Sequence, residues 1–427
     1  MVYACRRGTE RLGEISVDCG PDACGDRGDM TIRWRELSTA LAAVALFAVL
    51  LGRFLHLEID LPYDIVAKTG VFVTDEGWYT KNAQLLAKFG ILRHEQDFNF
   101  FTHGFAYTLL LAGLFELTSV DLLVARGLSL ALSCVSVLFL YKISRSSLSR
   151  ASALVVVLLG AVTLHNVTYS RMAILEPMAT SASLAAFYYY LKGPKAVGCR
   201  LLAFTLATLA VLTKTSFVFT FAALGLLEIH AAWRSFGSVG RGETIRALIV
   251  PALFVVLLLA AILSIKQLYP ADWQAFHELN VGQRLRAITA SSVMENGLRA
   301  LTYALASSNW LVFSIGCLTA GVAALLRPAR APNGGRANGE TALVVLWLGL
   351  GIMIFGFFSY QAPRYFYFVS YALPYLCLVA IERSLGDLKL LARLATAAVI
   401  VGHLALQLPG YQSWFARGGQ SSLTDMA

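Results

Sequence analysis

The sequence predicts an all-α polytopic membrane protein with about eleven transmembrane helices. Hydrophobic residues make up 57% of the 427 positions and charged residues only 14%, and the mean hydropathy is +0.64, far from the balance of a soluble domain. Apolar runs of roughly 17–25 residues recur along the chain, which is the length that a helix needs to cross a bilayer. The net charge of +9 comes from Lys and Arg in short loops between these runs. It therefore indicates membrane topology and argues against a nucleic-acid partner.

The chain is organised as a polar tail followed by one membrane domain. Residues 1–36 are expected to form a disordered cytoplasmic tail, within which Met30 resembles a natural start directly before the first apolar run. The membrane domain covers residues 37–408, and residues 409–427 form a short extracytoplasmic tail. The expected spans are 37–55, 125–141, 151–168, 177–191, 200–213, 217–230, 247–265, 298–326, 342–359, 365–381 and 392–408.

The seven cysteines predict no disulfide framework. Four of them lie in or beside apolar runs and three lie in the tail. The spacing Cys19-x4-Cys24 has no second pair of ligands, so it is a weak metal signal.

The segment "GFAYTLLLAGLF", residues 104–115, decides the topology. It has about a dozen apolar residues, too few to cross a hydrocarbon core of roughly 30 Å. We expect a re-entrant or interfacial helix within a large first extracytoplasmic loop, 56–124. With this segment excluded from the spans, the most basic loops fall on the cytoplasmic side, and so does the N-terminus. A second extracytoplasmic loop then covers residues 266–297.

The stretch "VTDEGWYTKNAQLLAKFG", residues 73–90, predicts an amphipathic helix in the first loop. Aromatic and aliphatic residues project onto one side of it and polar residues onto the other, as in a helix lying at headgroup depth. Two carboxylates, Asp75 and Glu76, stand at its start. An Asp at this position can simply cap the helix, and this explanation stays open beside a chemical one.

Further charged residues fall on the same predicted face of the membrane. They are Arg171 and Glu176 in "YSRMAILEP", Lys214 in "AVLTKTS", and Arg364 with Tyr365 in "QAPRYFYF". Each one alone can be a snorkelling cation or a carboxylate at a helix start. Together they place carboxylates and cations at one surface of a chain that otherwise keeps charge out of its span interiors.

This set of residues suits chemistry on a lipid-linked phosphate. Cations at headgroup depth can hold a phosphate and stabilise the charge on it when it leaves. The leaving group then needs no general acid, whereas an attacking hydroxyl needs a base, which a carboxylate at the interface can supply. Arg171 is expected to help Lys214 and Arg364 hold the phosphate.

Five segments resemble the GT-C superfamily of membrane glycosyltransferases, in particular the protein O-mannosyltransferases and aminoarabinose (lipid A) transferases. In family order they are "TDEGWYTKNAQLLAKFG", "HGFAYTLLLAGLFELTSVDLLVARGLSLAL", "SRMAILEPMATSASLAAFYYYL", "LATLAVLTKTSF" and "APRYFYFVSYALPYL". The resemblance covers roughly residues 37–385. It implies a GT-C-type bundle and transfer of a monosaccharide, hexose or pentose, from a polyprenyl-phosphate donor, with inversion at the anomeric carbon. It also implies neither a cofactor nor an obligatory catalytic metal.

The resemblance also assigns the acidic residues. The first-loop acid that serves as base falls on Asp75, with Glu76 beside it. The second acidic motif falls on Glu176, where relatives more often carry Asp. A first-loop His that usually precedes Pro falls on His103, but Gly104 follows it here.

The cations and the metal question follow from the same comparison. The span-end Lys falls on Lys214, followed by Thr215 where Gly is expected. The Arg-Tyr pair before a late span falls on Arg364 and Tyr365, which resemble donor-phosphate contacts. Some relatives hold zinc near this site, but no zinc pattern matches the spacing of His94, Glu95, His103, His165 and His277.

Two alternatives to an enzyme remain at this point, a transporter or flippase for a lipid-linked sugar and a non-catalytic scaffold. A transporter would carry polar groups near the midplane and repeat symmetry, and neither is evident in the sequence. The expected partners are the lipid-linked donor, membrane lipids and an acceptor that is a glycan, a glycolipid or a protein. No large extramembrane region follows the last span, which favours a lipid or glycan acceptor. The expected location is a bacterial inner or plasma membrane, with the active site extracytoplasmic.

Overall fold

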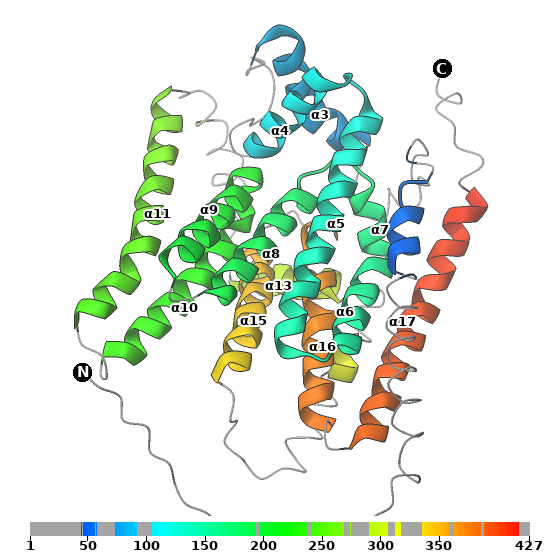
Figure 1. Cartoon of the computed structure of the whole chain (residues 1–427). Helices are drawn as coiled ribbons and strands as arrows, with labels where there is room; N and C mark the ends of the chain where they lie inside the picture. Colours follow the sequence, from blue (N-terminus) through cyan, green and yellow to red (C-terminus); the bar gives the residue numbers. More distant parts are fainter. Residues whose placement is uncertain are drawn as a thin grey trace, which may run out of the picture.

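The structure is a computed structural model that describes residues 44, 46–55, 57, 73–91, 104–193, 196–236, 241–268, 274, 290–305, 312–316, 335–357, 363–385 and 388–417. The side chains of some residues within these ranges, Asp75 among them, lie outside the described part. Every element in the described ranges is a helix (Figure 1). The predicted all-α class is therefore confirmed.

The helices follow one another along the chain as Figure 1 labels them. Their bounds are α3 (Val73–Phe89), α4 (Phe105–Leu117), α5 (Leu122–Ser147), α6 (Arg150–Val162), α7 (Leu164–Ser170), α8 (Glu176–Lys192), α9 (Val197–Thr213), η1 (Thr215–Phe217), α10 (Val218–Phe236), α11 (Arg241–Leu268), α13 (Ala290–Ala304), α15 (Gly335–Gly356), η3 (Pro363–Phe366), α16 (Val369–Leu385) and α17 (Lys389–Arg417).

Five helical segments of the described chain are long and apolar enough to cross a membrane. A sixth is added if α6 and α7, which are bent by 62° relative to each other, count as one broken span. The five segments are Leu122–Ser147, Thr215–Trp233, Gly339–Gly356, Arg364–Leu385 and Lys389–Pro409. Each predicted span except 151–168 and 298–326 coincides with helical structure in its described part, and 151–168 falls on the two bent helices α6 and α7. The predicted total of eleven is not confirmed.

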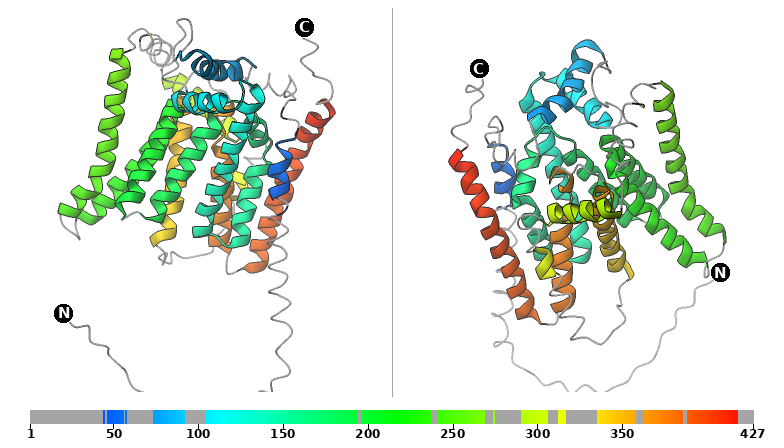
Figure 2. Two further views of the ribbon diagram at one scale, coloured as in Figure 1. Left: turned by 45° about the horizontal axis from the view of Figure 1, so that its top comes forward. Right: turned by 180° about the vertical axis from the view of Figure 1, so that it is seen from behind.

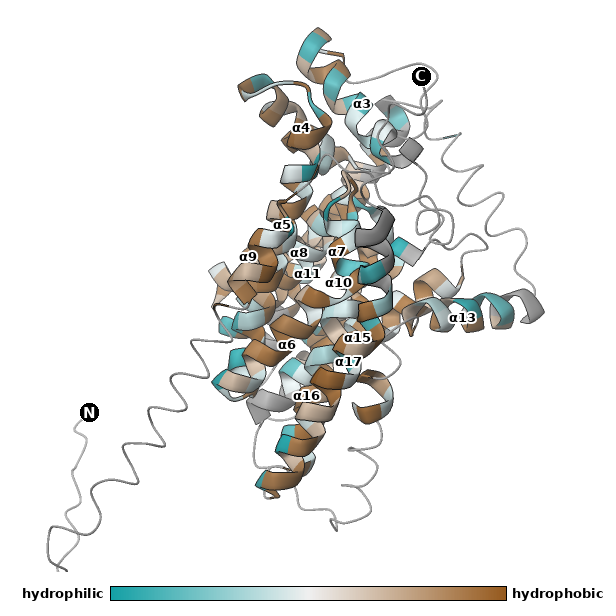
Figure 3. Cartoon of the chain, turned by 90° about the vertical axis from the view of Figure 1, so that its right-hand side faces the viewer, coloured by the Kyte–Doolittle hydropathy of each residue, from teal (hydrophilic) through white to brown (hydrophobic). Residues whose placement is uncertain are grey.

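The predicted span 298–326 is wrong as a single helix. Helix α13 starts earlier and ends at Ala304, and the next described piece is a separate helical segment over residues 312–316. In Figure 2 (right) and Figure 3, α13 lies across the bundle instead of along it. Its buried side carries Ala300 and Ala304, which face α15, while its exposed surface carries an ion pair between Glu295 and Arg299. Average hydropathy over a long window does not reveal such a two-sided pattern.

Helices α3 and α4 form a cap over one end of the bundle (Figures 1 and 2). They pack against each other, and α4 also contacts α5 and α9. A helix of 13 residues is about 20 Å long, too short for the hydrocarbon core. This agrees with the prediction that residues 104–115 do not span the membrane.

Helix α8 lies at the centre of the bundle (Figure 1). Small residues in "ATSASLAA" are buried along it, and they let α5 and α9 approach its backbone closely. The hydroxyl of Ser183 bonds the carbonyl of Ala179 and the hydroxyl of Thr220 in α10 (2.7 and 2.8 Å). Because Glu176 is the first residue of α8, the packing of this buried helix determines where Glu176 lies.

Gly104 gives the first testable consequence of the fold. Its φ of 110° is in the left-handed region, and a Cβ built on it would lie 2.9 Å from Cδ2 of Leu175. Gly104→Ala should lower the free energy of unfolding by about 1–3 kcal/mol, because it adds backbone strain and a clash. Thermal unfolding in detergent measures the effect.

Gly113→Ala is the matched control, because Gly113 lies in α4, the helix that Gly104 precedes. A Cβ at Gly113 meets no atom within 4 Å, and alanine favours a helix interior over glycine by about 0.5–1 kcal/mol. We expect this variant to be at least as stable as the parent. Equal stability of the two variants would contradict the role given to Gly104.

Candidate functional site

Three helix ends bring Glu176, Lys214 and Arg364 together. Glu176 begins α8, where Pro177 fixes the first turn. Lys214 follows the last residue of α9 with an extended backbone, and Arg364 lies in the short helix η3. The ammonium of Lys214 donates to Oε1 of Glu176, and Nε of Arg364 lies 3.5 Å from the same oxygen. All three side chains are buried, and Glu176 is 0% exposed.

Tyr365 completes this group, which we call the Glu176 cluster: Glu176, Lys214, Arg364 and Tyr365. The ammonium of Lys214 lies 4.0 Å from the centre of the Tyr365 ring, and Cζ of Arg364 lies 5.2 Å from it, both within cation–π range. The ring also stacks on Phe355 of α15 at 5.3 Å. Four predicted site residues from three segments of the sequence are thus neighbours in space.

The Glu176 cluster brings two cations to one carboxylate. Lys214 and Arg364 approach the same oxygen of Glu176. The second carboxylate oxygen, Oε2 of Glu176, accepts no hydrogen bond within the described part of the chain. The cluster therefore brings two cations to one place at the end of the bundle, as a site for an anionic group requires.

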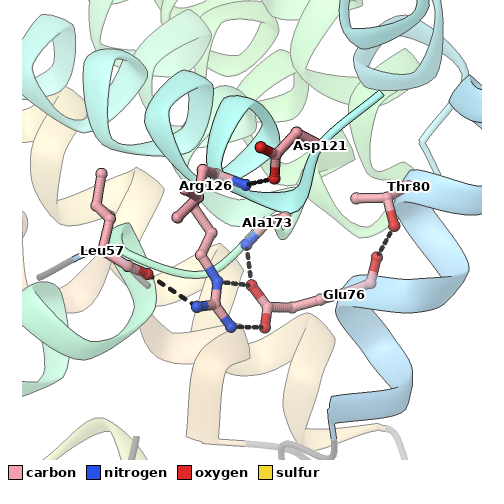
Figure 4. Close-up of polar contacts among 7 residues, drawn as sticks. Leu57, Glu76, Thr80, Asp121, Arg126 and Ala173 are labelled. Carbon is pink, nitrogen blue, oxygen red and sulfur yellow. Dashed lines mark hydrogen bonds and ion pairs between the residues drawn. The ribbon is translucent and has the colours of Figure 1, made fainter. Parts of the chain in front are cut away.

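Glu76 lies in a second buried ion pair, shown in Figure 4. Its carboxylate receives two hydrogen bonds from Arg126 of α5, from Nε to Oε1 (3.0 Å) and from Nη2 to Oε2 (2.8 Å). The backbone N–H of Ala173 also donates to Oε1 (2.7 Å), and Nη1 of Arg126 donates to the carbonyl of Leu57 (2.8 Å). We call the Glu76–Arg126 pair the clamp, because it ties the first-loop helix to the bundle. These contacts favour a structural role for Glu76 over the predicted catalytic one.

Residues 171–175 form a connection, here called the strap, between α7 and the first residue of α8. Arg171 is buried in it and donates from Nη1 to the carbonyl of Leu55 (3.0 Å). Ala173 bonds the clamp, and the carbonyl of Ile174 accepts from Ser129 (3.5 Å). This contact links the strap to the described segment 46–55. The predicted role of Arg171 in binding the donor phosphate stays a prediction.

Asp75 lies in α3, directly before the clamp residue Glu76. Because α3 already includes Val73, Asp75 is not its N-cap, and the alternative explanation of Asp75 as a cap is wrong. The side chain of Asp75 lies outside the described part of the chain. Its predicted role as a base stays a prediction.

The sequence contains five His and Glu residues that could approach a metal on the predicted extracytoplasmic side, of which only His165 lies in the described part. It is buried in α7, with its ring edge-on to Tyr169 at 4.6 Å. The residues outside the described part are His94, Glu95, His103 and His277. Among the described residues, no group of three His, Cys, Asp or Glu side chains could hold a metal ion.

The sequence did not point to Arg126 or Arg53. Both lie inside predicted spans, in 125–141 and 37–55, and both are buried. Both stand within three residues of a predicted span end, so the expectation that span interiors carry no charge is unaffected, but their burial was not expected. The spacing of Arg126, Ser129 and Ser133 could have indicated a buried polar contact, because it places three polar residues on one side of α5.

Comparison with known proteins agrees with the fold. The family model for dolichyl-phosphate-mannose-protein mannosyltransferases matches residues 99–276. A search of curated proteins found no significant match.

Two solved structures of ArnT from Cupriavidus metallidurans have a similar fold. The structure bound to undecaprenyl phosphate superposes with a TM-score of 0.53 and 18% sequence identity, over 83% of this chain and 62% of the ArnT chain. For the apo structure the TM-score is 0.51 and the identity 16%, over 84% of this chain and 62% of ArnT. This chain thus spans less than two thirds of the length of ArnT. The predicted resemblance to the GT-C fold is confirmed.

The clamp gives a testable coupling energy. Glu76→Gln leaves the buried guanidinium of Arg126 without its carboxylate, so we expect a loss of about 3–5 kcal/mol in the free energy of unfolding. The double variant Glu76→Gln/Arg126→Met should lose less than the sum of the two single variants. Unfolding in detergent measures all three.

The exposed pair Glu295–Arg299 is the control for the clamp, because its side chains are 72% and 42% exposed. Glu295→Gln should change stability by less than about 1 kcal/mol. If Glu76→Gln had an effect as small as this control, the clamp would not anchor α3.

Proposed function

We propose that this chain is a membrane glycosyltransferase. It transfers a monosaccharide from a polyprenyl-phosphate donor to an acceptor hydroxyl at the extracytoplasmic face, with inversion at the anomeric carbon. The observation that carries the proposal is the Glu176 cluster, a buried group of two cations around one carboxylate at the end of the bundle that α3 and α4 cover. The donor is anionic where it meets the protein and apolar along its chain, which suits a cationic site in a membrane domain.

The charge of the Glu176 cluster fits the change in charge during transfer. A polyprenyl-phosphate sugar is a phosphodiester with one negative charge, and the released polyprenyl phosphate carries about −1.5 to −2 near pH 7. Cations fixed before the reaction stabilise charge as it develops, and in a water-poor site this effect is strong. In the proposal, Lys214 and Arg364 supply that stabilisation, and Tyr365 and Glu176 hold their side chains.

The reaction can be written with its atoms balanced. The acceptor hydroxyl gives its proton to the carboxylate of Asp75 while its oxygen attacks the anomeric carbon. A new bond forms between the acceptor oxygen and that carbon. The bond from carbon to the phosphate oxygen breaks, and its electron pair goes to the phosphate. Attack from the side opposite the leaving group inverts the configuration.

The clamp gives Asp75 a fixed support in this proposal. Glu76 follows Asp75 in α3, and its carboxylate accepts from Arg126 of α5 and from Ala173 of the strap. The backbone next to Asp75 is therefore tied to the connection that ends at Glu176. Glu76 then acts as a positioning residue, and the proposed catalytic base is Asp75 alone.

Similarity to known proteins supports the class of donor. The ArnT structure contains undecaprenyl phosphate, and the family description names dolichyl-phosphate-mannose as the donor of its members and protein as their acceptor. We take from them the polyprenyl-phosphate donor. The acceptor proposed for this chain is a hydroxyl on a glycan, a glycolipid or a protein.

Asp75→Asn tests the assignment of the base. The amide keeps the shape of the side chain but cannot take the proton, so kcat/KM should fall by about 10²–10⁴-fold, whereas affinity for undecaprenyl phosphate should stay near the parental value. Radiolabelled transfer from a polyprenyl-phosphate sugar measures the rate. Full transfer activity in a folded Asp75→Asn protein would refute this role. Flipping of the lipid-linked sugar across vesicles without any transfer would support the transporter alternative.

Lys214→Met and Arg364→Met test the phosphate site. Each removes one cation from the leaving group, and we expect kcat/KM for the donor to fall by about 10²–10³-fold. Affinity for undecaprenyl phosphate, measured by titration in detergent, should fall as well.

Arg200→Gln is the matched control for these two variants. Arg200 is a buried cation of the same helix α9, paired with Glu228 at 2.6 Å, and its Cα lies roughly 20 Å along the helix from Lys214. This variant should be less stable but should keep the parental kcat/KM per folded molecule. An equal loss of kcat/KM in Arg200→Gln would contradict a local role for Lys214 and Arg364.

A further inference from the structure

The break between α6 and α7 creates free backbone groups inside the bundle. The last four carbonyls of a helix have no partner within it, and in hydrocarbon each of them must find one. All four carbonyls at the end of α6 accept from side chains. The donors are Thr163 to Leu159 (2.8 Å), Asn166 to Gly160 (2.6 Å), Arg53 to Ala161, and Tyr411 to Val162 (2.8 Å).

The last helix, α17, supplies much of this compensation. Its residues His403, Gln407 and Tyr411 are four apart and therefore lie on one side of the helix. Tyr411 donates to the end of α6, and Oε1 of Gln407 accepts from the backbone N–H of Leu164 (2.7 Å), the first residue of α7. Nε2 of His403 is 3.3 Å from the hydroxyl of Thr163, at the break itself. We call these three residues the α17 stripe.

The α17 stripe stands out from the rest of its helix. Helix α17 lies at the edge of the bundle beside α6 and α7 (Figure 1), and large apolar side chains on it, such as Val401, Leu404 and Leu408, are exposed. Polar side chains within a bilayer are costly unless they have partners. The α6–α7 break provides these partners, so the stripe and the break stabilise each other.

Arg53 holds the other side of the break. Its guanidinium donates to the carbonyl of Ala161, to Ser170 at the end of α7 (3.5 Å) and to Ser133 of α5 (3.2 Å). A cation at the C-terminus of α6 also interacts favourably with the helix dipole. Both ends of the short helix α7 are therefore fixed, at Leu164 by Gln407 and at Ser170 by Arg53.

The direction of α7 determines where the strap delivers Glu176. Only residues 164–175 separate the break from Glu176, and the strap is bonded at Arg171 and Ala173 to neighbouring segments. We propose that the α17 stripe positions the Glu176 cluster for the donor phosphate, with Gln407 as its central residue. This inference rests on the function proposed above. It assigns a role in the reaction to a helix that carries none of the proposed phosphate ligands.

Gln407→Met tests the inference, with Gln407→Glu as the rescue variant. Methionine fills similar space without an acceptor, so the N–H of Leu164 loses its bond. Glutamate keeps an acceptor oxygen. The amide nitrogen that it replaces, Nε2, has no hydrogen-bond partner among the described residues, and a buried carboxyl can stay protonated and neutral. Two quantities are measured, hydrogen exchange over residues 163–175 and the Kd for undecaprenyl phosphate in detergent.

We expect faster exchange over residues 163–175 in Gln407→Met and a Kd for undecaprenyl phosphate raised about 10-fold or more, since small displacements of binding groups are costly. KM for the donor should rise in parallel and KM for the acceptor should not. Gln407→Glu should restore most of the affinity. Tyr411→Phe, which removes a single hydroxyl, should show the same changes in exchange and Kd more weakly. It replaces Gln407→Met as the test variant if Gln407→Met does not fold.

Glu228→Gln is the control for a general loss of stability, because it breaks the remote Arg200–Glu228 pair. Parental exchange and parental Kd in folded Gln407→Met, or a rise in Kd no larger than in Glu228→Gln, would overturn the inference. If the parental protein itself bound no undecaprenyl phosphate, the proposed function would fail separately. The exchange measurement would then decide the positioning claim, because unchanged exchange over residues 163–175 in Gln407→Met overturns it and faster exchange supports it.

Discussion

A bilayer leaves no water to satisfy polar groups, and the structure depends on this constraint. Each buried charge and each freed backbone group must find its partner within the protein. The consequence is clearest at the α6–α7 break. The last four carbonyls of α6 accept from Thr163 and Asn166 next to the break and from the distant Arg53 and Tyr411. The same rule pairs Glu76 with Arg126 and Arg200 with Glu228. These polar contacts, surrounded by apolar side chains, thus determine which helices pack against each other and in which orientation.

The Glu176 cluster gathers two cations around one carboxylate. Lys214 and Arg364 approach the same oxygen of Glu176, whereas Glu76 and Glu228 each pair with one arginine. Two cations therefore lie where three helix ends meet. An anionic headgroup with an apolar tail is a ligand that can reach such a place from the bilayer.

The sequence predicted much of this arrangement, and the failures have physical causes. Helix positions followed from apolar runs, and the ends of spans were enough to group Glu176, Lys214, Arg364 and Tyr365, because charged residues at one membrane surface are close in depth. The clamp was missed because Glu76 and Arg126 are 50 positions apart, and no periodicity reports such a pair.

Two other errors came from treating an apolar run as a straight span. Residues 151–168 fold as two helices bent by 62°, and side chains from nearby and distant segments satisfy the carbonyls that the break leaves free. The run 298–326 begins with the two-sided helix α13, whose alanines face α15. In both cases the deciding contacts are made with other helices, so composition alone could not reveal them.

The central claim is that the Glu176 cluster receives the phosphate of a polyprenyl lipid. An experimental structure of the protein bound to undecaprenyl phosphate tests it most directly. The account predicts phosphate oxygens within hydrogen-bond distance of the ammonium of Lys214 and the guanidinium of Arg364, beside the ring of Tyr365. A phosphate bound elsewhere on the protein, with Lys214 and Arg364 in contact only with Glu176, would contradict it.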